Sequence, residues 1–378
     1  MQKVRFGDVV KRVNIYVDRF NTDRLYYVGK GGSIEPEALE IKPQAKIKGA
    51  TIGFKFHFGF DPGHILFMSR CFDQHKAATA TFRGVCSDST YVVETRDENI
   101  LLQSYLQLVM QSNDFWNWCE EHKSGGVNFL INYGTLETYE FSLPSLEEQK
   151  ILADKLWAAY RVKESYRQLL ATTDDMLIAQ FHHMFGNVDN PKVKVCRLGD
   201  ICDVERGGSP RPISAFITNN DDGVNWIKIG DAESDSMYIN KTEEKIIQEG
   251  IKMSRMVHKG DLLLSNSMSF GHPYILNIDG CIHDGWLVLH LNPKIVTPIF
   301  LCRYLGLQST YQQFKKLAAG GVVKNLNKDV VKVLPVIIPT LEEQEKFATI
   351  ATQAEATKAS LRQSIDAIDR VIRSLINQ

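Results

Sequence analysis

The sequence predicts an α/β (α+β) tandem repeat, in which two mixed α/β globular domains are separated by two long helices. Three observations predict this fold. The phrase Leu143–Gln149 returns as Ile338–Gln344, so that Ser145 is matched by Thr340, 195 residues later. About 40 residues with helical spacing of apolar side chains follow each copy. Short anchor motifs also recur in the same order in both halves, which indicates an internal duplication.

Length and composition bound the class of protein. At 378 residues, with 44% hydrophobic and 24% charged residues, the chain is expected to form two or three globular domains. Its net charge of −1 means that any DNA contact must come from local basic clusters. No apolar run predicts a membrane span or a signal peptide. The seven cysteines lack CxxC spacing, which favours a reduced, cytoplasmic protein without a zinc site.

Each repeated phrase predicts the start of a helix. Ser145 and Thr340 can cap a helix by accepting a hydrogen bond from a first-turn N–H. Glu148 and Glu343 follow three residues later and can reach back to the cap residue, as in a capping box. A proline before each cap holds the entering chain extended.

The duplication divides the chain into four segments. We expect domains at 1–143 and 187–338, and helices at 144–186 and 339–378. The anchors of the first domain are Arg5–Val9, Gly63–Ser69, Cys86 with Tyr91–Val93, and Gly125–Val127. Their counterparts are Arg197–Ile201, Gly260–Ser265, Cys281 with Trp286–Val288, and Gly320–Val322.

Within the first domain, the pattern predicts a strand or a short helix–strand element over 4–13 and helical spacing over 101–118. Further strands are expected at Tyr26–Val28, Ile65–Met68, Tyr91–Val93 and Tyr139–Phe141. The second domain is expected to repeat this order, with loops that differ freely.

The two long helices carry apolar stripes that are expected to pack against each other. The stripe of the first helix includes Leu152, Leu156, Tyr166, Leu170 and Leu177, and Lys163, Thr173 and Gln180 interrupt it. The stripe of the second includes Phe347, Ile350, Leu361, Ile365, Ile368 and Ile372. A stripe of this kind can also pack on the helix's own domain.

Chain order favours an antiparallel pair. A helix of about 40 residues spans roughly 60 Å at about 1.5 Å per residue. The second domain begins where the first helix ends and finishes where the second begins. In a parallel pair it would have to bridge that length, although a domain of this size has a radius of gyration near 15 Å. We therefore expect an antiparallel coiled coil with pseudo-twofold symmetry.

No catalytic signature has supporting context. The sequence lacks a GxxxxGK[ST] phosphate loop, an HExxH zinc pair and a GxSxG elbow. Gly29–Gly32 follows a strand without leading into a clear helix, so it is weak as a nucleotide loop. His182 and His183 are better explained as helix-terminal cations than as metal ligands. His283-Asp284 with His272 could form an acid–base pair, but no nucleophile is arranged nearby.

Polar, basic and glycine-containing loops are the candidates for DNA contact, because arginine reads guanine and short polar groups contact phosphates. In the second domain the candidates are Arg206, Ser209, Arg211, Lys228, Ser267, Ser269, Lys324 and Asn325. In the first domain they are Lys30, Arg70, Lys76, Arg83, Lys123 and Ser124. Ordinary solvated loops are the competing interpretation.

The repeated phrases, the start at Arg197, the loop Gly207–Pro212 and the run Trp226–Asp231 resemble the specificity subunit of type I restriction-modification systems. The resemblance covers essentially the whole chain. It implies two target recognition domains that each read one half of a split DNA sequence, and two spacer helices. It implies docking of two modification subunits carrying S-adenosylmethionine, with restriction subunits using ATP and Mg joining them. It also implies that this chain has no catalytic site or cofactor.

Two other classes of function remain open at this point. A non-DNA adaptor could hold two ligand-binding domains at a fixed separation, and the near-neutral charge favours it. An enzyme with its own methyltransferase or nuclease site is the other, and the missing motifs argue against it.

Overall fold

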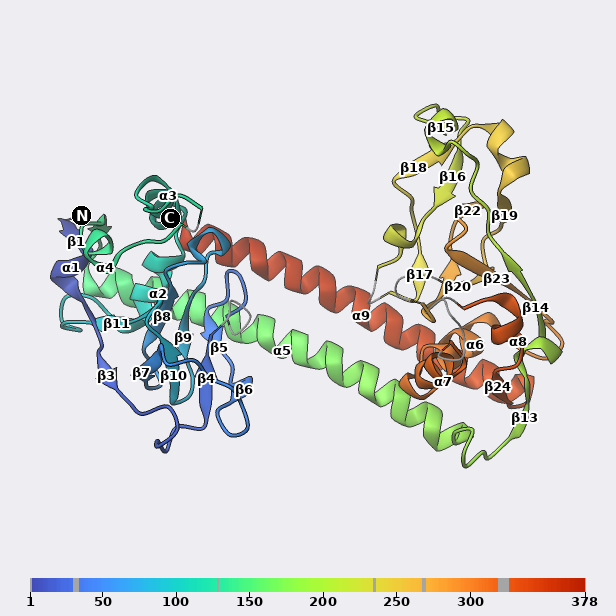
Figure 1. Ribbon diagram of the computed structural model, residues 1–378, viewed down its shortest axis with the longest axis horizontal. Helices are drawn as coiled ribbons and strands as arrows, with labels where there is room; N and C mark the ends of the chain where they lie inside the picture. Colours follow the sequence, from blue (N-terminus) through green and yellow to red (C-terminus); the bar gives the residue numbers. More distant parts are fainter. Residues whose placement is uncertain are drawn as a thin grey trace. The chain divides into compact units, whose positions relative to one another are not determined.

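The computed structural model describes residues 2–29, 34–127, 129–233, 236–266, 270–318 and 326–377. The contacts between residues divide the chain into two compact units. Unit 1 holds residues 1–168 and 362–378, and unit 2 holds residues 169–361. Each unit therefore contains one globular part together with a portion of each long helix (Figure 1).

Short strands and short helices build the globular part of unit 1. Its strands are β1 Gln2–Arg5, β2 Val10–Arg12, β3 Ile15–Tyr16, β4 Tyr26–Val28, β5 Glu40–Ile41, β6 Ala45–Lys46, β7 Phe56–Phe60, β8 Ile65–Met68, β9 Ala77–Ala80, β10 Gly84–Ser87, β11 Thr90–Thr95 and β12 Glu140–Leu143. Its helices are α1 Phe6–Val9, the 3-10 turn η1 Phe72–Gln74, α2 Gln103–Gln111, α3 Asn113–Glu121 and α4 Tyr133–Leu136.

Unit 2 repeats this composition. Its strands are β13 Lys194–Arg197, β14 Cys202–Arg206, β15 Ile217–Thr218, β16 Val224–Ile227, β17 Tyr238–Ile239, β18 Glu244–Ile246, β19 Arg255–Val257, β20 Leu262–Ser265, β21 Pro273–Leu276, β22 Gly280–Ile282, β23 Trp286–Leu291 and β24 Pro335–Ile338. Its helices are η2 Leu198–Asp200, η3 Ile213–Ala215, η4 Ile229–Asp231, η5 Gln248–Met253, α6 Pro298–Leu305, α7 Gln308–Ala318 and α8 Lys328–Lys332.

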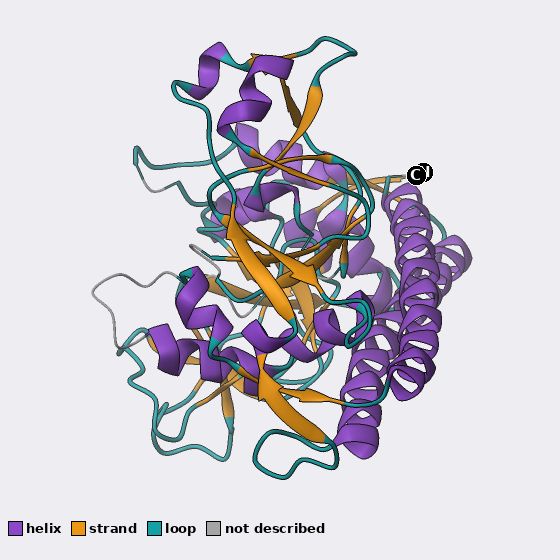
Figure 2. Ribbon diagram, turned by 90° about the vertical axis from the view of Figure 1, so that its right-hand side faces the viewer, coloured by secondary structure: helices purple, strands orange, loops and turns teal. Residues whose placement is uncertain are grey.

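The two long helices, α5 (Leu146–Phe185) and α9 (Leu341–Ile376), have the expected positions and lengths. Figure 2 shows both as uninterrupted helices. The helix expected over 101–118 is instead two helices, because Ser112 breaks it and caps α3 by accepting a hydrogen bond from Phe115 N at 3.2 Å. Among the described helices, none combines the length and apolar character needed to cross a membrane.

Both expected capping boxes are confirmed, with matching geometry. Ser145 N donates to Glu148 Oε2 at 3.0 Å, and Glu148 N donates to Ser145 Oγ at 3.3 Å. The same distances recur between Thr340 and Glu343. Hydrogen bonds from the cap side chain and the cap backbone lower the pKa of each glutamate from its ordinary value of 4.5.

These caps predict a pH dependence of stability. Because the folded-state pKa of Glu148 and Glu343 is lowered, their contribution is complete above the ordinary value of 4.5 and is lost as the pH falls through the folded value. We expect the urea midpoint of the Glu148→Gln, Glu343→Gln double variant to fall less steeply below pH 4.5 than that of the parent chain, since glutamine caps without titrating. Glu147→Gln is the control. Parallel midpoint curves for parent and double variant would contradict the prediction.

Two five-stranded sheets and a helical layer form the core of unit 1. The sheet β2-β11-β8-β9-β5 lies in the middle. Alternate residues of β8 point to opposite faces, as the two-residue period of a strand requires. Ile65 and Phe67 join a cluster with the apolar residues of α2 and α3, whereas Leu66 and Met68 join a cluster with the sheet β3-β7-β10-β4-β6.

Unit 2 repeats the middle sheet strand for strand, in the order β14-β23-β20-β21-β17. The alternation is also repeated, since Leu262 and Leu264 pack with α6 and α7, and Leu263 packs towards the outer sheet. The expected pairing of anchors is confirmed here: Gly63 and Gly260 both have positive φ, at 92° and 97°, and each lies two residues before its strand, β8 or β20. Glycine suits this left-handed conformation because it has no side chain.

The outer sheets differ at one strand. Four strands correspond, since β7-β10-β4-β6 in unit 1 matches β19-β22-β16-β18 in unit 2, each with a parallel central pair. The fifth strand lies at opposite edges. In unit 1, β3 extends the sheet beside β7, whereas in unit 2 β15 extends it beside β18. The scaffold is therefore shared, and the outer-sheet edges distinguish the two units.

The glutamine that ends each repeated phrase fastens its helix to its own globular part. Gln149 is fully buried, accepts a hydrogen bond from Leu102 N at 2.9 Å, and donates to Ile100 O and Pro144 O at 2.9 and 3.0 Å. Gln344 makes the equivalent bonds to Thr297 N, Ile295 O and Pro339 O at 2.8, 2.8 and 3.0 Å. The repeat of this phrase thus reflects a tertiary contact as well as a cap.

The long helices are antiparallel within each unit, as expected. In unit 1 the start of α5 packs with the end of α9, where Leu156 and Ile372 share a cluster. In unit 2 the end of α5 packs with the start of α9, where Phe347 contacts the rings of Phe181 and Phe185. Of the expected packing residues, Leu156, Leu177, Phe347, Leu361 and Ile372 are buried, and Leu152, Tyr166, Leu170, Ile350, Ile365 and Ile368 are partly buried.

Lysines that interrupt the apolar stripe take part in the helix pairing. Lys163 of α5 forms an ion pair with Asp369 of α9 in unit 1. In unit 2, Lys358 of α9 lies 2.6 Å from Asp174 of α5. Each member of the second pair lies 195 residues from its counterpart in the first, so the duplication preserved a reciprocal ion pair. Lys163 thus interrupts the apolar stripe, as expected, and the ion pair with Asp369 gives its charge a partner on the other helix.

Candidate nucleic-acid interface

The loop after β14 is the best-defined part of the expected DNA-contacting surface. Gly207 N donates to Trp286 O at 3.0 Å, and Gly208 N donates to Ile282 O at 3.2 Å. A Cβ atom on Gly207 would lie 2.2 Å from His283 O, so only glycine allows this close approach. The loop is therefore held against β22 and β23.

Asp284 organises the side chains of this loop. Its backbone oxygen accepts a hydrogen bond from Arg206 Nε at 2.9 Å. Its carboxylate accepts one from Ser209 Oγ at 3.0 Å and lies 3.7 Å from the Arg211 guanidinium. The Arg211 side chain nevertheless remains 83% exposed. The backbone of the loop is thus held in place while the Arg211 side chain points to solvent. This geometry suits contact with the edge of a nucleobase or with a phosphate.

Sequence reasoning missed this role of Asp284. The sequence suggests only an acid–base pair for His283-Asp284, and the structure does place His283 Nε2 3.0 Å from Asp284 Oδ1. The Asp284 carboxylate is also engaged by the loop, which gives it a positioning role. No local pattern announces this contact, because Ser209 and Asp284 are 75 residues apart.

Asn266 and Leu326, each at the end of a described segment of unit 2, also lie close to Asp284. Asn266 is buried, and its Nδ2 donates to Asp284 O at 3.2 Å. Leu326 N donates to Asn266 O at 3.0 Å. Asn266 and Leu326 are therefore bonded to each other, and Asn266 shares the Asp284 backbone oxygen with Arg206. The expected contact residues Ser267, Ser269, Lys324 and Asn325 themselves lie outside the described residues, as does Lys30.

A groove of about 820 Å³ opens beside Arg206. Its lining includes Arg255, Lys328 and Lys332, which the sequence reasoning did not select. Acidic side chains also line it, and Arg255 is paired with Glu205 at 3.0 Å. The groove is therefore of mixed charge.

Lys228 is occupied by carboxylates of its own unit. Its Nζ lies 2.9 Å from Glu244 and 3.9 Å from Glu243. The hydrogen bond to Glu244 is the main reason that the pKa of Lys228 is raised. A phosphate would have to replace these partners, so Lys228 is a weaker candidate than Arg211.

In unit 1 the structure brings together three expected residues. Arg70 and Lys123 line one cavity of about 390 Å³ with Phe129, and the Lys123 ammonium lies 4.5 Å from the centre of the Phe129 ring. Ser124 follows directly and forms an isolated bridge with Leu130. Arg70 and Lys123 thus place two cations at one cavity, and one of them, Lys123, forms an ion pair with Glu120.

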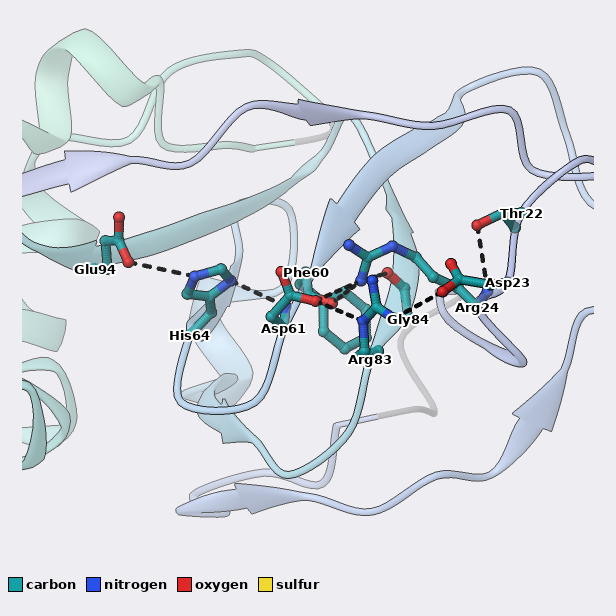
Figure 3. Close-up of polar contacts among 9 residues, drawn as sticks. All are labelled: Thr22, Asp23, Arg24, Phe60, Asp61, His64, Arg83, Gly84 and Glu94. Atoms are coloured by element: carbon teal, nitrogen blue, oxygen red, sulfur yellow. Dashed lines mark hydrogen bonds and ion pairs between the residues drawn. The ribbon is translucent and has the colours of Figure 1, made fainter.

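Of the other two described candidates of unit 1, Lys76 is buried, whereas Arg83 is exposed but bonded to carboxylates of its own unit. Lys76 is only 5% exposed. It directly precedes β9, and its backbone oxygen accepts a hydrogen bond from Met68 N at 3.0 Å. The expectation of a solvated loop lysine is wrong there. Arg83 donates to Asp61 at 3.0 Å and to Asp23 at 2.7 Å (Figure 3).

Figure 3 shows that Arg83 belongs to a larger polar network. Buried Arg24 also donates to Asp61, at 3.0 Å, and His64 connects the Asp61 backbone to Glu94. Burial acts to raise the pKa of Asp61, but the hydrogen bonds from Arg24 and Arg83 outweigh it and lower the pKa. The network joins loops of unit 1. Because the Arg83 guanidinium already pairs with Asp23 and Asp61, it is a weaker candidate for a phosphate contact.

Comparison with known proteins accounts for the duplicated architecture. The family described as "Type I restriction modification DNA specificity domain" matches residues 1–171 and 190–370. Among solved structures, the S subunit of a type I restriction-modification system from M. genitalium has a TM-score of 0.60 at 13% identity, covering 99% of this chain and 94% of that one.

A chain from a structure on complex assembly and conformational transition of the type I R-M system has a TM-score of 0.55 at 18% identity, covering 99% of this chain and 96% of that one. At these identities the structural likeness shows the fold. The family match spans both repeats and nearly the whole length, and the chain therefore belongs to the type I restriction-modification DNA specificity family.

Proposed function

We propose that this chain reads a DNA target in two separate parts, one with each unit, and holds the modification subunits of its complex. The observation that carries the proposal is the pairing of one shared scaffold with two different surfaces. The middle sheets match strand for strand, whereas the loops after β2 and β14 and the outer-sheet edges differ. Such a chain suits two unlike half-sites.

The long helices are the proposed docking surface for the partner subunits. Beyond the residues used for pairing, α5 exposes Ile151 and Val162 in unit 1, and Leu169, Met176 and Ile178 in unit 2. Exposed apolar side chains on a helix mark a surface that a partner can cover. Two similar units favour two copies of a modification subunit. Restriction subunits join them in the same proposal.

The methylation and cleavage chemistry would then lie on the partners, together with S-adenosylmethionine, ATP and Mg. An activity assay on the isolated chain tests this division. Methyl transfer or cleavage by the chain alone would contradict it.

The central experiment maps methylated bases in DNA from cells that contain this chain and its modification subunit. We expect a split, asymmetric motif with two specified parts separated by unspecified bases. A continuous motif, or a motif that does not change when unit 2 loops are exchanged, would overturn the proposal.

Arg211→Ala should weaken recognition of one half-site by about 1–3 kcal/mol, because a well-placed arginine contact has this value. The high exposure of Arg211 means that stability and assembly should stay unchanged. Lys241→Ala, an exposed cation of the same unit, is the matched control. The assignment of Arg211 is wrong if affinity and the methylated motif both stay as in the parent.

A non-DNA adaptor is the alternative that the net charge of −1 favours. A salt titration of DNA binding by the assembled complex separates the two functions. Neutralisation of phosphates by lysine and arginine makes affinity fall steeply with salt. Binding that is absent or insensitive to salt would favour the adaptor.

A further inference from the structure

Unit 1 carries three strongly exposed aromatic side chains at the edge that distinguishes its outer sheet. Tyr16 in β3 is 73% exposed, Phe20 in the following loop 63%, and Phe54 in the turn before β7 76%. Large rings are usually buried at least in part, and groups of exposed rings mark interaction surfaces. We name Tyr16, Arg19, Phe20, Phe54, Lys55 and His57 the aromatic edge.

Contacts between the two segments hold the aromatic edge in place. Tyr16 pairs with Phe58 across the two strands, and its ring is stacked on His57 with an interplanar angle of 3°. Arg19 Nε donates to Ile52 O at 3.2 Å, and its guanidinium lies 4.6 Å from the centre of the Phe20 ring. The rings and the cation are therefore presented by one connected edge of the sheet.

Charge distinguishes this part of unit 1 from its counterpart. Residues 10–60 contain nine Lys and Arg and five Asp and Glu, an excess of four positive charges. The corresponding residues 202–257, from the start of β14 to the end of β19, contain seven and ten, an excess of three negative charges. The aromatic edge thus lies in the basic member of the pair, which favours a polyanionic partner.

We propose that the aromatic edge binds duplex DNA and inserts an aromatic ring at a base step, so that unit 1 reads its half-site through deformation of the DNA. Apolar wedges beside cations are the side chains that unstack a step while the cations hold the phosphates. Phe54 is the wedge, because it is the most exposed ring and lies in a turn next to Lys55. Specificity then arises from the cost of deforming each sequence.

The inference rests on the proposed function and adds a difference between the two half-sites. Unit 2 presents Arg211 from a loop fixed by Asp284, which suits direct reading of a base edge. Unit 1 presents rings and cations, which suits a bent or unstacked step. One chain would therefore use two modes of recognition on the same DNA.

The test uses the assembled complex of this chain with its modification subunit and a duplex that contains the mapped motif. Fluorescent aminopurine replaces an adenine other than the methylated one, in one half-site at a time, because methyltransferases flip their target base out of the stack. We expect binding to increase its fluorescence, as unstacking does, only in the half-site read by unit 1. Phe54→Ala should remove that increase and weaken binding about tenfold, and Arg19→Gln should lower the salt slope by about one.

Two controls match these changes. Ile100→Ala removes an exposed apolar side chain elsewhere in unit 1, and Lys3→Gln removes an exposed charge. Neither should alter fluorescence or affinity. A complex that binds and methylates its motif normally with Phe54→Ala and Arg19→Gln would overturn this inference and leave the proposed function intact.

The remaining outcomes also decide. Variants that no longer assemble with the modification subunit, although they remain folded, would show that the aromatic edge binds protein and would overturn the inference. A parent complex with no sequence-specific DNA binding would overturn the proposed function itself.

Discussion

Replacing Phe347 by alanine should lower the local free energy of unfolding of unit 2 by about 3–5 kcal/mol, the usual cost of truncating a buried phenylalanine. Phe347 is 1% exposed at the start of α9. Its ring centre lies 5.2 Å from that of Phe181 and 5.7 Å from that of Phe185, both at the end of α5. The substitution would leave a cavity where the two helices and the globular part of unit 2 meet.

Hydrogen exchange of unit 2 core amides measures this effect locally, so it does not require the whole chain to unfold as one unit. Ile178→Ala is the matched control, because Ile178 lies on α5 in the same unit and is 45% exposed. It should change stability by about 0.5 kcal/mol or less. A loss below about 1 kcal/mol for Phe347→Ala would show that this aromatic cluster is not a main source of stability.

Gln344→Leu should destabilise unit 2 by about 2–4 kcal/mol, although leucine is apolar and of similar size. The glutamine is fully buried and bonds to three backbone groups. Leucine would leave Thr297 N without this acceptor and Ile295 O and Pro339 O without this donor. An unsatisfied buried polar group costs about 1–3 kcal/mol, and partial relaxation or water limits the sum.

The repeat supplies an internal replicate for this prediction. Gln149→Leu removes the corresponding bonds to Leu102, Ile100 and Pro144 and should destabilise unit 1 by a similar amount. Gln353→Leu changes an exposed glutamine of α9 and should be nearly neutral. If Gln344→Leu proves as mild as Gln353→Leu in thermal or urea unfolding, the buried glutamine is not the fastening that we infer.

Both predictions concern how a long helix is fixed to its own globular part. The capping box sets where the helix begins, and the glutamine bonds its first turn to the residues that directly precede α2 or α6. The reciprocal lysine ion pairs join α5 to α9 in each unit. If a complex uses these helices to set the distance between half-sites, variants at these positions should also loosen the spacing that is recognised.

The sequence by itself determined the duplication, the two long helices, their caps and the order of the anchor motifs. These features are local or periodic, so propensity and pattern record them: a capping box needs four residues, and a helical stripe repeats every three or four. Family membership followed from the same signals. The antiparallel order of the two long helices also followed from chain connectivity alone.

Only the tertiary structure decided which polar residues are available for contact. Lys76 and Arg83 read as loop cations, yet one is buried and the other is held by Asp23 and Asp61. The sequence also did not predict the positioning role of Asp284, the place of β3 at the sheet edge, or the aromatic edge. Each depends on groups far apart in the chain, and burial and long-range pairing leave no period in the sequence.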